Sequence, residues 1–310
     1  MRKITPHSTF LCIVLFILVT ACSKTAEKSS DSELIRVPYQ SLATAEERDY
    51  FMYLPKGYHY EPGKKWPLML FLHGNGERGN AKDELDYVIK HGPLYEAWIQ
   101  KRDLPFIIIA PQLPMYGMDS IEYIANRTPD EIPKRLDDGV PDRPADSSTP
   151  YPMLGSVQDT IMVYPPQGPP QGWWKLEEDI LLIVESSIEE FNIDRNRIYL
   201  TGLSYGGFGT WYIASKHPEM FAAIAPVVGY GHPELMKPIA DENLSVWCFS
   251  GGRDMVVPQK YFYPGLNELE KLGHSKLRFT THEDMGHDTW TRVYGGQDIY
   301  DWFLLHELEK

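Results

Sequence analysis

Short apolar runs alternate with segments of helical periodicity over most of the chain. Runs typical of strands cover residues 49–55, 67–72, 106–110, 197–201, 223–228, 246–249 and 277–280. Several are apolar at every position, as expected of parallel strands that helices cover on both faces. Apolar residues at helical spacing mark residues 176–191 and 206–217 as helices. This alternation predicts an α/β fold with a mostly parallel sheet, helices on both faces, and a site at the carboxyl ends of the strands.

Residues 113–172 interrupt the alternation. They hold 11 of the chain's 25 prolines and nine acidic against four basic residues, and no apolar period extends far enough for a strand or helix. A loop of this length inside a compact domain indicates either a functional insertion or disorder. We expect a long, partly ordered, proline-rich insertion that acts as a lid or pocket wall.

The first residues resemble an export signal. Arg2 and Lys3 precede an apolar stretch over residues 10–19 that is short for a membrane span, and the stretch ends at a lipobox-like Val-Thr-Ala-Cys with its cysteine at Cys22. We therefore predict a lipoprotein signal peptide at 1–21, with Cys22 as the lipidated residue; a plain secretory signal is the alternative. A polar tether at 22–36 and a catalytic domain at 37–310 would follow. This organisation predicts a protein of the bacterial cell envelope, anchored to the outer membrane or facing the periplasm.

Net charge and cysteine usage bear on the partners and the covalent bonds to be expected of this protein. The formal net charge of −13, or −15 without the two basic residues of the signal, argues against a nucleic-acid partner. Cys248 is the only cysteine in the predicted domain, so no disulfide is expected within it. Because Cys248 lies in an apolar run, we expect a buried and inert thiol.

The strongest chemical signal follows the run at 197–201. Gly202-Leu203-Ser204-Tyr205-Gly206 matches the nucleophile-elbow pattern G-x-S-x-G, in which a tight strand-to-helix turn exposes the serine hydroxyl. The pattern alone recurs by chance, because glycine-flanked serines are common in ordinary turns. Ser204 is a candidate nucleophile only if an acid and a base accompany it.

Two later loops supply these partners in the order that α/β-hydrolases use, acid before histidine. Asp254 follows the run at 246–249, and His287 follows the run at 277–280. His287 would take the serine proton and return it to the leaving group, and Asp254 would orient the imidazole. The rival histidines His274, His282 and His306 and the rival acids Asp284 and Asp288 occupy less suitable positions.

The loop after the run at 67–72 is the candidate for an oxyanion hole. We expect the backbone amides of Asn75 and Tyr205 to be the donors, with Gly76 as the alternative to Asn75. His73 is expected to be a structural hydrogen-bonding group rather than a base. Glu77 and Arg78 are expected to form an ion pair that holds the loop.

Five motifs together resemble the esterase branch of predicted peptidases and polyhydroxybutyrate-depolymerase-like esterases, to which the feruloyl and acetylxylan esterases of carbohydrate esterase family one are related. The motifs cover residues 53–58, 72–79, 110–112, 202–207 and 285–288. The resemblance implies an α/β-hydrolase fold and a serine esterase that needs neither cofactor nor metal. It implies feruloyl or acetyl esters on plant polysaccharide as first candidate substrates. The insertion at 113–172 departs from this pattern and could reshape the acyl pocket.

Two alternatives remain at this stage. Oligopeptidases share the fold and chemistry, although they usually add a large gating domain for which this chain leaves little room. A non-catalytic glycan-binding lipoprotein that kept the fold is the other, and loss of a triad residue would be its mark. All three triad types are present here.

Overall fold

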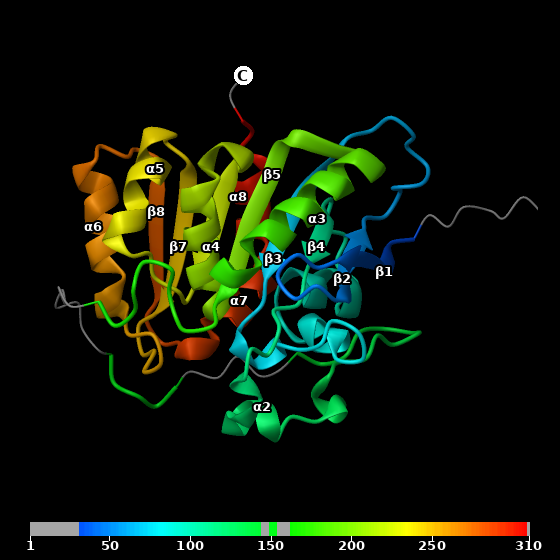
Figure 1. The fold of residues 1–310 in the computed structure, drawn as a ribbon, viewed down its shortest axis with the longest axis horizontal. Coiled ribbons are helices and arrows are strands. Elements are labelled where there is room, and N and C mark those ends of the chain that lie inside the picture. Colours follow the sequence, from blue (N-terminus) through cyan, green and yellow to red (C-terminus); the bar gives the residue numbers. More distant parts are fainter. Residues whose placement is uncertain (1–30, 144–148, 154–161, 309–310) are drawn as a thin grey trace, which may run out of the picture.

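A single mixed sheet forms the centre of the molecule (Figure 1). The computed structural model describes residues 31–143, 149–153 and 162–308, and within them the strand order is β1-β2-β4-β3-β5-β6-β7-β8. The strands are β1 (Glu33–Gln40), β2 (Glu47–Leu54), β3 (Trp66–Leu72), β4 (Ile107–Ala110), β5 (Ile193–Leu203), β6 (Ala223–Val227), β7 (Ser245–Gly251) and β8 (Leu277–His282). Strand β2 pairs antiparallel with both β1 and β4, and the other neighbours are parallel. The strand predictions and the mostly parallel α/β class are confirmed.

The helices differ widely in length. The α-helices are α1 (Gly92–Leu94), α2 (Glu122–Ala125), α3 (Glu177–Glu190), α4 (Tyr205–Lys216), α5 (Met236–Asp241), α6 (Tyr263–Lys271), α7 (Trp290–Gly295) and α8 (Asp298–Leu304). The short 3-10 segments are η1 (Asn75–Glu77), η2 (Leu85–Lys90), η4 (Met118–Ser120), η5 (Pro129–Glu131), η6 (Trp173–Leu176), η7 (Pro218–Met220), η8 (Pro233–Leu235), η9 (Gln259–Tyr261) and η10 (His287–Thr289), and η3 (Tyr95–Ile99) is a π-helical turn. Helices α3 and α4 confirm the two predicted helices.

Two apolar layers sandwich the sheet because successive strand residues point to opposite faces. In β3, Leu68, Leu70 and Leu72 belong to one layer, and Met69 and Phe71 belong to the other. Helices α3 to α6 complete the first layer, whereas η2, α1, η3, α7 and α8 complete the second. The near-continuous apolar strands therefore reflect burial on both faces.

The parallel strands bring their carboxyl ends to one edge of the sheet. Leu72 of β3 pairs with Gly202 of β5, and Gly251 of β7 pairs with His282 of β8. The loops that follow these strands therefore gather at this edge, which is the lower edge in Figure 1, beside α2. All the candidate catalytic residues lie in these loops.

Strand β1 was not expected from the sequence. It begins at Glu33, so residues 33–36 of the predicted tether belong to the sheet. Ile35, Val37 and Tyr39 of this edge strand pack on the first layer, and Leu34 alone packs on the second. The alternation is short and includes Pro38, which is tolerated at an edge position.

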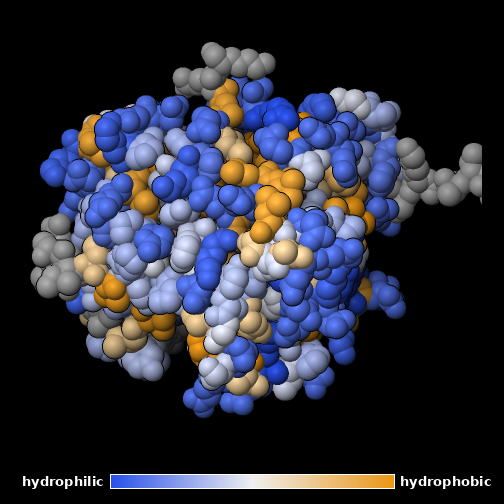
Figure 2. All heavy atoms as spheres, in the orientation of Figure 1, coloured by the Kyte–Doolittle hydropathy of each residue, from blue (hydrophilic) through white to orange (hydrophobic). Residues whose placement is uncertain are grey.

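The segment at 113–172 contains only short helical turns where it is described, namely η4, α2 and η5. Residues 144–148 and 154–161 of this segment lie outside the described residues, as do residues 1–30 with the predicted signal peptide and Cys22. Among the helices that are described, none combines the length and apolarity needed to cross a bilayer. The face seen in Figure 2 is largely hydrophilic, with apolar residues in small groups.

Candidate active site

Ser204 occupies a strained turn between β5 and α4. Its backbone has φ 52° and ψ −115°, a region that non-glycine residues rarely adopt. The turn is fixed by its amide, which donates to the carbonyl of Val227 at 2.9 Å. A Cβ at Gly206 would lie 1.8 Å from the carbonyl oxygen of Leu72, and one at Gly202 would lie 2.4 Å from the carbonyl oxygen of Gly206. Both glycines are thus required by the close approach of β3, β5 and α4.

The structure brings the three predicted triad residues together. The Nε2 atom of His287 lies 2.9 Å from the Oγ of Ser204, and its Nδ1 lies 2.8 Å from Oδ2 of Asp254. Oδ1 of Asp254 accepts hydrogen bonds from the amides of Val256 and Val257, each at 2.8 Å. With the buried carboxylate accepting from Nδ1–H, Nε2 is left to accept the serine proton.

The rival acid Asp284 and the rival histidines are engaged elsewhere. Asp284 forms a two-point ion pair with Arg292, which lowers the pKa of Asp284 to about 2. His274 bonds to the carbonyl of Leu244 at 2.7 Å, and His306 bonds to the carbonyl of Trp302 at 2.8 Å. His282 ends β8, where its ring stacks on Phe249.

The two predicted oxyanion donors begin neighbouring helical turns. Asn75 is the first residue of η1, and Tyr205 is the first residue of α4. Strands β3 and β5 are hydrogen-bonded neighbours, and a Cβ at Gly74 would lie 2.8 Å from Cδ1 of Leu203. The two loops are therefore in contact beside Ser204. The roles of these amides, and of Gly76 as the alternative, stay predictions.

His73 has the predicted structural role. Its Nδ1–H donates to the carbonyl of Gly74 at 2.6 Å, and its Nε2 accepts from the amide of Leu113 at 2.9 Å. Burial lowers its pKa to about 3, so the ring is neutral. The buried indole of Trp173 donates to the carbonyl of His73 at 3.1 Å and anchors the end of the insertion to this loop.

The predicted ion pair between Glu77 and Arg78 is wrong, because Arg78 donates to other groups and the Glu77 carboxyl lies beside the imidazoles of His73 and His91. Arg78 donates to the side chain of Asn75 and to the carbonyls of Pro114 and Gln171, the latter two at 2.7 Å. These carbonyls belong to opposite ends of the insertion. Arg78 thus ties both ends of the insertion to the candidate oxyanion loop, a role that neighbouring sequence positions do not reveal.

Glu77 points into the protein instead. Its carboxyl lies 4.0 Å from Nδ1 of His73 and 3.9 Å from Nε2 of His91, distances too long for hydrogen bonds. Burial raises the pKa of Glu77 to about 7, and burial lowers the pKa of His91 to about 4. A buried carboxyl that takes up a proton near neutral pH therefore adjoins the loop.

Sequence reasoning missed Trp290, which packs edge-to-face on the imidazole of His287 with ring centroids 5.2 Å apart. In the sequence, Trp290 is recognisable only as an aromatic residue three positions after His287. Beside these two rings lies a cavity of about 460 Å³ whose wall includes Tyr151, Met255 and Val256. Arg253 donates to the carbonyl of Tyr151 at 2.7 Å, so residues 149–151 of the segment at 113–172 form part of this wall.

Metal ions and reactive thiols require particular arrangements of side chains. Among residues 31–143, 149–153 and 162–308, no group of three or more His, Cys, Asp or Glu side chains is arranged to hold a metal ion. Cys248 is fully buried, and burial raises the pKa of its thiol, as expected for an inert core residue.

Known proteins resemble parts of this sequence. Residues 175–264 match the model of the prolyl oligopeptidase family. A bifunctional acetylxylan esterase/xylanase from Neocallimastix patriciarum is 29% identical over 101 residues, which are 30% of this chain and 15% of that protein. Poly(3-hydroxyalkanoate) depolymerase C from Paucimonas lemoignei is 40% identical over 47 residues, which are 15% of this chain and 11% of that protein. The chain thus spans a small part of these curated relatives.

Solved structures give the same fold over most of the chain. A thermostable esterase is 26% identical with a TM-score of 0.58, and the match covers 88% of this chain and 63% of that one. A ferulic acid esterase is 16% identical with a TM-score of 0.55, covering 88% of this chain and 99% of that one. The chain has the α/β-hydrolase fold and is similar to esterases, and its elbow serine, histidine and aspartate are connected as in a serine hydrolase.

Proposed function

We propose that this α/β-hydrolase is a serine esterase that cleaves carboxylic esters through an acyl-enzyme on Ser204. The observation that carries the proposal is the continuous hydrogen-bonded path from Ser204 through His287 to Asp254. A serine hydroxyl is a weak nucleophile at neutral pH, so an adjacent, oriented base is what makes it competent.

The geometry supports a two-step reaction. The Oγ of Ser204 forms a bond to the ester carbonyl carbon while its proton moves to Nε2 of His287. The amides of Asn75 and Tyr205 would stabilise the oxyanion of the tetrahedral intermediate. As the bond to the alcohol oxygen breaks, His287 returns the proton to that oxygen. Water, deprotonated by His287, then attacks the acyl carbon and releases the acid and Ser204.

Acetyl or feruloyl esters on plant polysaccharide are the proposed substrates. The names of similar proteins, an acetylxylan esterase and a ferulic acid esterase, support this class. The cavity beside His287 also supports a bulky ester, because exposed apolar side chains of Met255 and Val256 form part of its wall. We assign the insertion at 113–172 as a wall of the substrate site.

A serine peptidase is the second candidate, favoured by the match to the prolyl oligopeptidase family over residues 175–264. An amide needs the same triad, so substrate comparison must separate the two. Turnover of proline-containing peptides without turnover of any ester would favour the peptidase over the esterase. A non-catalytic glycan-binding protein is less well supported, because glycan binding does not require a hydrogen-bonded triad.

We also propose attachment to a bacterial envelope membrane through a lipid on Cys22. The support is the sequence pattern around that residue alone. Mass spectrometry of the N-terminal peptide from envelope fractions tests it, with Cys22→Ala as the comparison. A lipidated Cys22 is expected, whereas an unmodified chain cleaved at another bond would contradict the proposal.

The function is tested with a panel of acetyl, feruloyl and longer acyl esters and proline-containing peptides. Ser204→Ala and His287→Ala should each lower kcat by about 10⁶ if the residues act as a unit. Retention of most ester hydrolysis by folded Ser204→Ala would exclude the proposal. Shortening residues 113–172 should alter the preference among acyl groups, and an unaltered preference would contradict the assignment as a pocket wall.

A further inference from the structure

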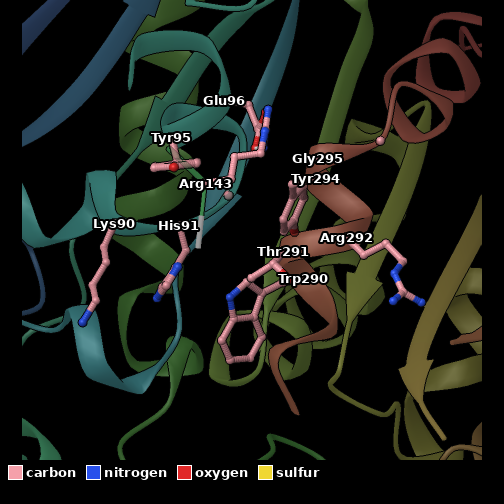
Figure 3. Close-up of a pocket in the computed structure, with 12 residues that line it drawn as sticks. Lys90, His91, Tyr95, Glu96, Arg143, Trp290, Thr291, Arg292, Tyr294 and Gly295 are labelled. Atoms are coloured by element: carbon pink, nitrogen blue, oxygen red, sulfur yellow. The ribbon is translucent and has the colours of Figure 1, made fainter. Parts of the chain in front are cut away.

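A second cavity, of about 350 Å³, is lined by Trp290 and by residues of the loop around His91. Figure 3 shows its residues, which come from η2, α1, η3, α7 and the insertion. Trp290 lines both this cavity and the one beside His287. The second cavity is therefore lined by the same indole ring that packs on the candidate base, His287.

The walls of the second cavity suit a ring. Tyr95, His91 and Trp290 surround its centre in Figure 3, and the rings of His91 and Trp290 have centroids 5.5 Å apart. Its volume is near the lower end of the range of about 300–1,000 Å³ for small-molecule pockets, which corresponds to one ring rather than a long chain.

Charged residues line the cavity but are already paired. Arg143 forms a two-point ion pair with the buried carboxylate of Glu96. Lys90 pairs with Glu131 at 2.6 Å, and Arg292 pairs with Asp284. In Figure 3 the side chains of Lys90 and Arg292 extend away from the space between the rings. A charged ligand would have to compete with these ion pairs, so a neutral ligand fits better.

A wholly apolar ligand fits poorly as well. The indole N–H of Trp290 is buried and has no hydrogen-bond partner in the described part of the chain, which is costly unless a ligand supplies an acceptor. The guanidinium of Arg143 has five N–H donors, of which Glu96 accepts two. A neutral ring with an apolar face and several hydroxyl oxygens would pack on the aromatic side chains and accept hydrogen bonds from these donors.

We infer that the cavity between Tyr95, His91 and Trp290 is a glycosyl subsite that binds a neutral sugar ring on the alcohol side of the ester. This inference rests on the proposed esterase function and identifies the substrate part that the enzyme recognises away from the scissile bond. The sugar's C–H face packs on the aromatic rings, and its hydroxyl oxygens accept from the indole of Trp290 and from Arg143. Because Arg143 belongs to the insertion, the insertion contributes to alcohol specificity.

Two esters with the same acyl group test the subsite: methyl acetate and a mono-O-acetylated methyl xyloside. Tyr95→Leu removes one ring of the wall while keeping apolar bulk. Gly295→Leu adds a side chain to the wall at a position where a Cβ would have its nearest neighbour, Nη1 of Arg143, at 3.4 Å. Tyr60→Leu, at a side chain that is 53% exposed, is the control for loss of a tyrosine.

The measured quantity is the ratio of kcat/KM for the acetylated xyloside to kcat/KM for methyl acetate. Wild type should prefer the xyloside, and Tyr95→Leu and Gly295→Leu should each lower the ratio about tenfold, the size of a typical aromatic contact. The control should leave the ratio unchanged. Equal losses on both esters, or no loss, would overturn the inference. Selective loss on methyl ferulate, with the xyloside unaffected, would assign the cavity to an aryl acyl group and overturn it too.

A binding measurement separates failure of the subsite from failure of the esterase proposal. Methyl β-xyloside is titrated into folded Ser204→Ala and into the double variant with Tyr95→Leu by calorimetry. Binding that the double variant loses supports the subsite even if wild type hydrolyses no ester. Absence of binding to Ser204→Ala overturns the subsite even if wild type hydrolyses simple esters.

Discussion

The buried carboxyl of Glu77 predicts a pH-dependent stability that a single substitution should remove. The side chain is 8% exposed, and its Oε2 has no hydrogen-bond partner in the described part of the chain. The nearest imidazoles, those of His73 and His91, have pKa values lowered to about 3 and about 4, so neither carries a compensating charge at neutral pH. Ionising Glu77 in the folded protein is therefore unfavourable.

The magnitude follows from the pKa of Glu77, which burial raises from 4.5 to about 7. At about 1.4 kcal/mol per pKa unit, this difference corresponds to about 3 kcal/mol. Because the folded-state pKa is the higher one, the stabilisation is complete below pH 4.5 and is lost as the pH rises through 7. Glu77→Gln cannot ionise, so its stability relative to wild type should rise by about 3 kcal/mol between pH 4.5 and pH 8.

The assay is urea unfolding of both proteins at several pH values over this interval. Only the difference between the two free energies of unfolding is interpreted, because other titrating groups are common to both. Glu61→Gln, at an exposed carboxyl paired with Lys64, is the matched control for loss of a surface carboxyl, and its stability should differ from that of wild type by less than about 1 kcal/mol throughout the interval. A constant difference for Glu77→Gln would refute the reasoning that this carboxyl is neutral in the folded state below pH 7.

Three further substitutions test the site. Gly206→Ala places a Cβ 1.8 Å from the carbonyl oxygen of Leu72 and should destabilise the protein by more than about 4 kcal/mol. The measurement is the unfolding temperature, and a small drop would contradict the packing of the elbow. Asp254→Asn should lower kcat by about 10⁴ without unfolding the protein, because the imidazole loses its orienting acceptor; unchanged kcat would exclude this role. Arg78→Met removes the hydrogen bonds to Asn75 and to both ends of the insertion. The value of kcat/KM should fall by about 10- to 100-fold, and limited proteolysis within 113–172 should accelerate. Unchanged proteolysis would show that Arg78 does not hold the insertion.

The sequence was sufficient wherever a local pattern determines local structure. The strand at 67–72 is apolar throughout because both of its faces are buried, and this was readable directly. The elbow was readable because the spacing of Gly202, Ser204 and Gly206 expresses a steric requirement of one tight turn. Asp254 and His287 were found because the fold places each acid and base after a particular strand.

The features that the sequence did not predict depend on contacts between segments that are far apart in the chain. Arg78 was paired with its neighbour in the sequence interpretation, whereas two of its three partners lie 36 and 93 positions away. Trp290 meets His91 across about two hundred positions, so neither the second cavity nor its walls had a sequence signal. Strand β1 was missed because most of its side chains are only partly buried or exposed, so its sequence differs little from a polar linker.

Covalent labelling tests the central claim, nucleophilic catalysis by Ser204, most directly. An alkyl fluorophosphonate forms a bond from an activated serine oxygen to phosphorus with loss of fluoride, and peptide mass spectrometry locates the adduct. One adduct is expected, on the peptide that contains Ser204, formed in parallel with loss of ester hydrolysis and much more slowly in His287→Ala. An adduct on another residue that accounts for the inhibition, or full hydrolysis by a protein labelled at Ser204, would contradict the account.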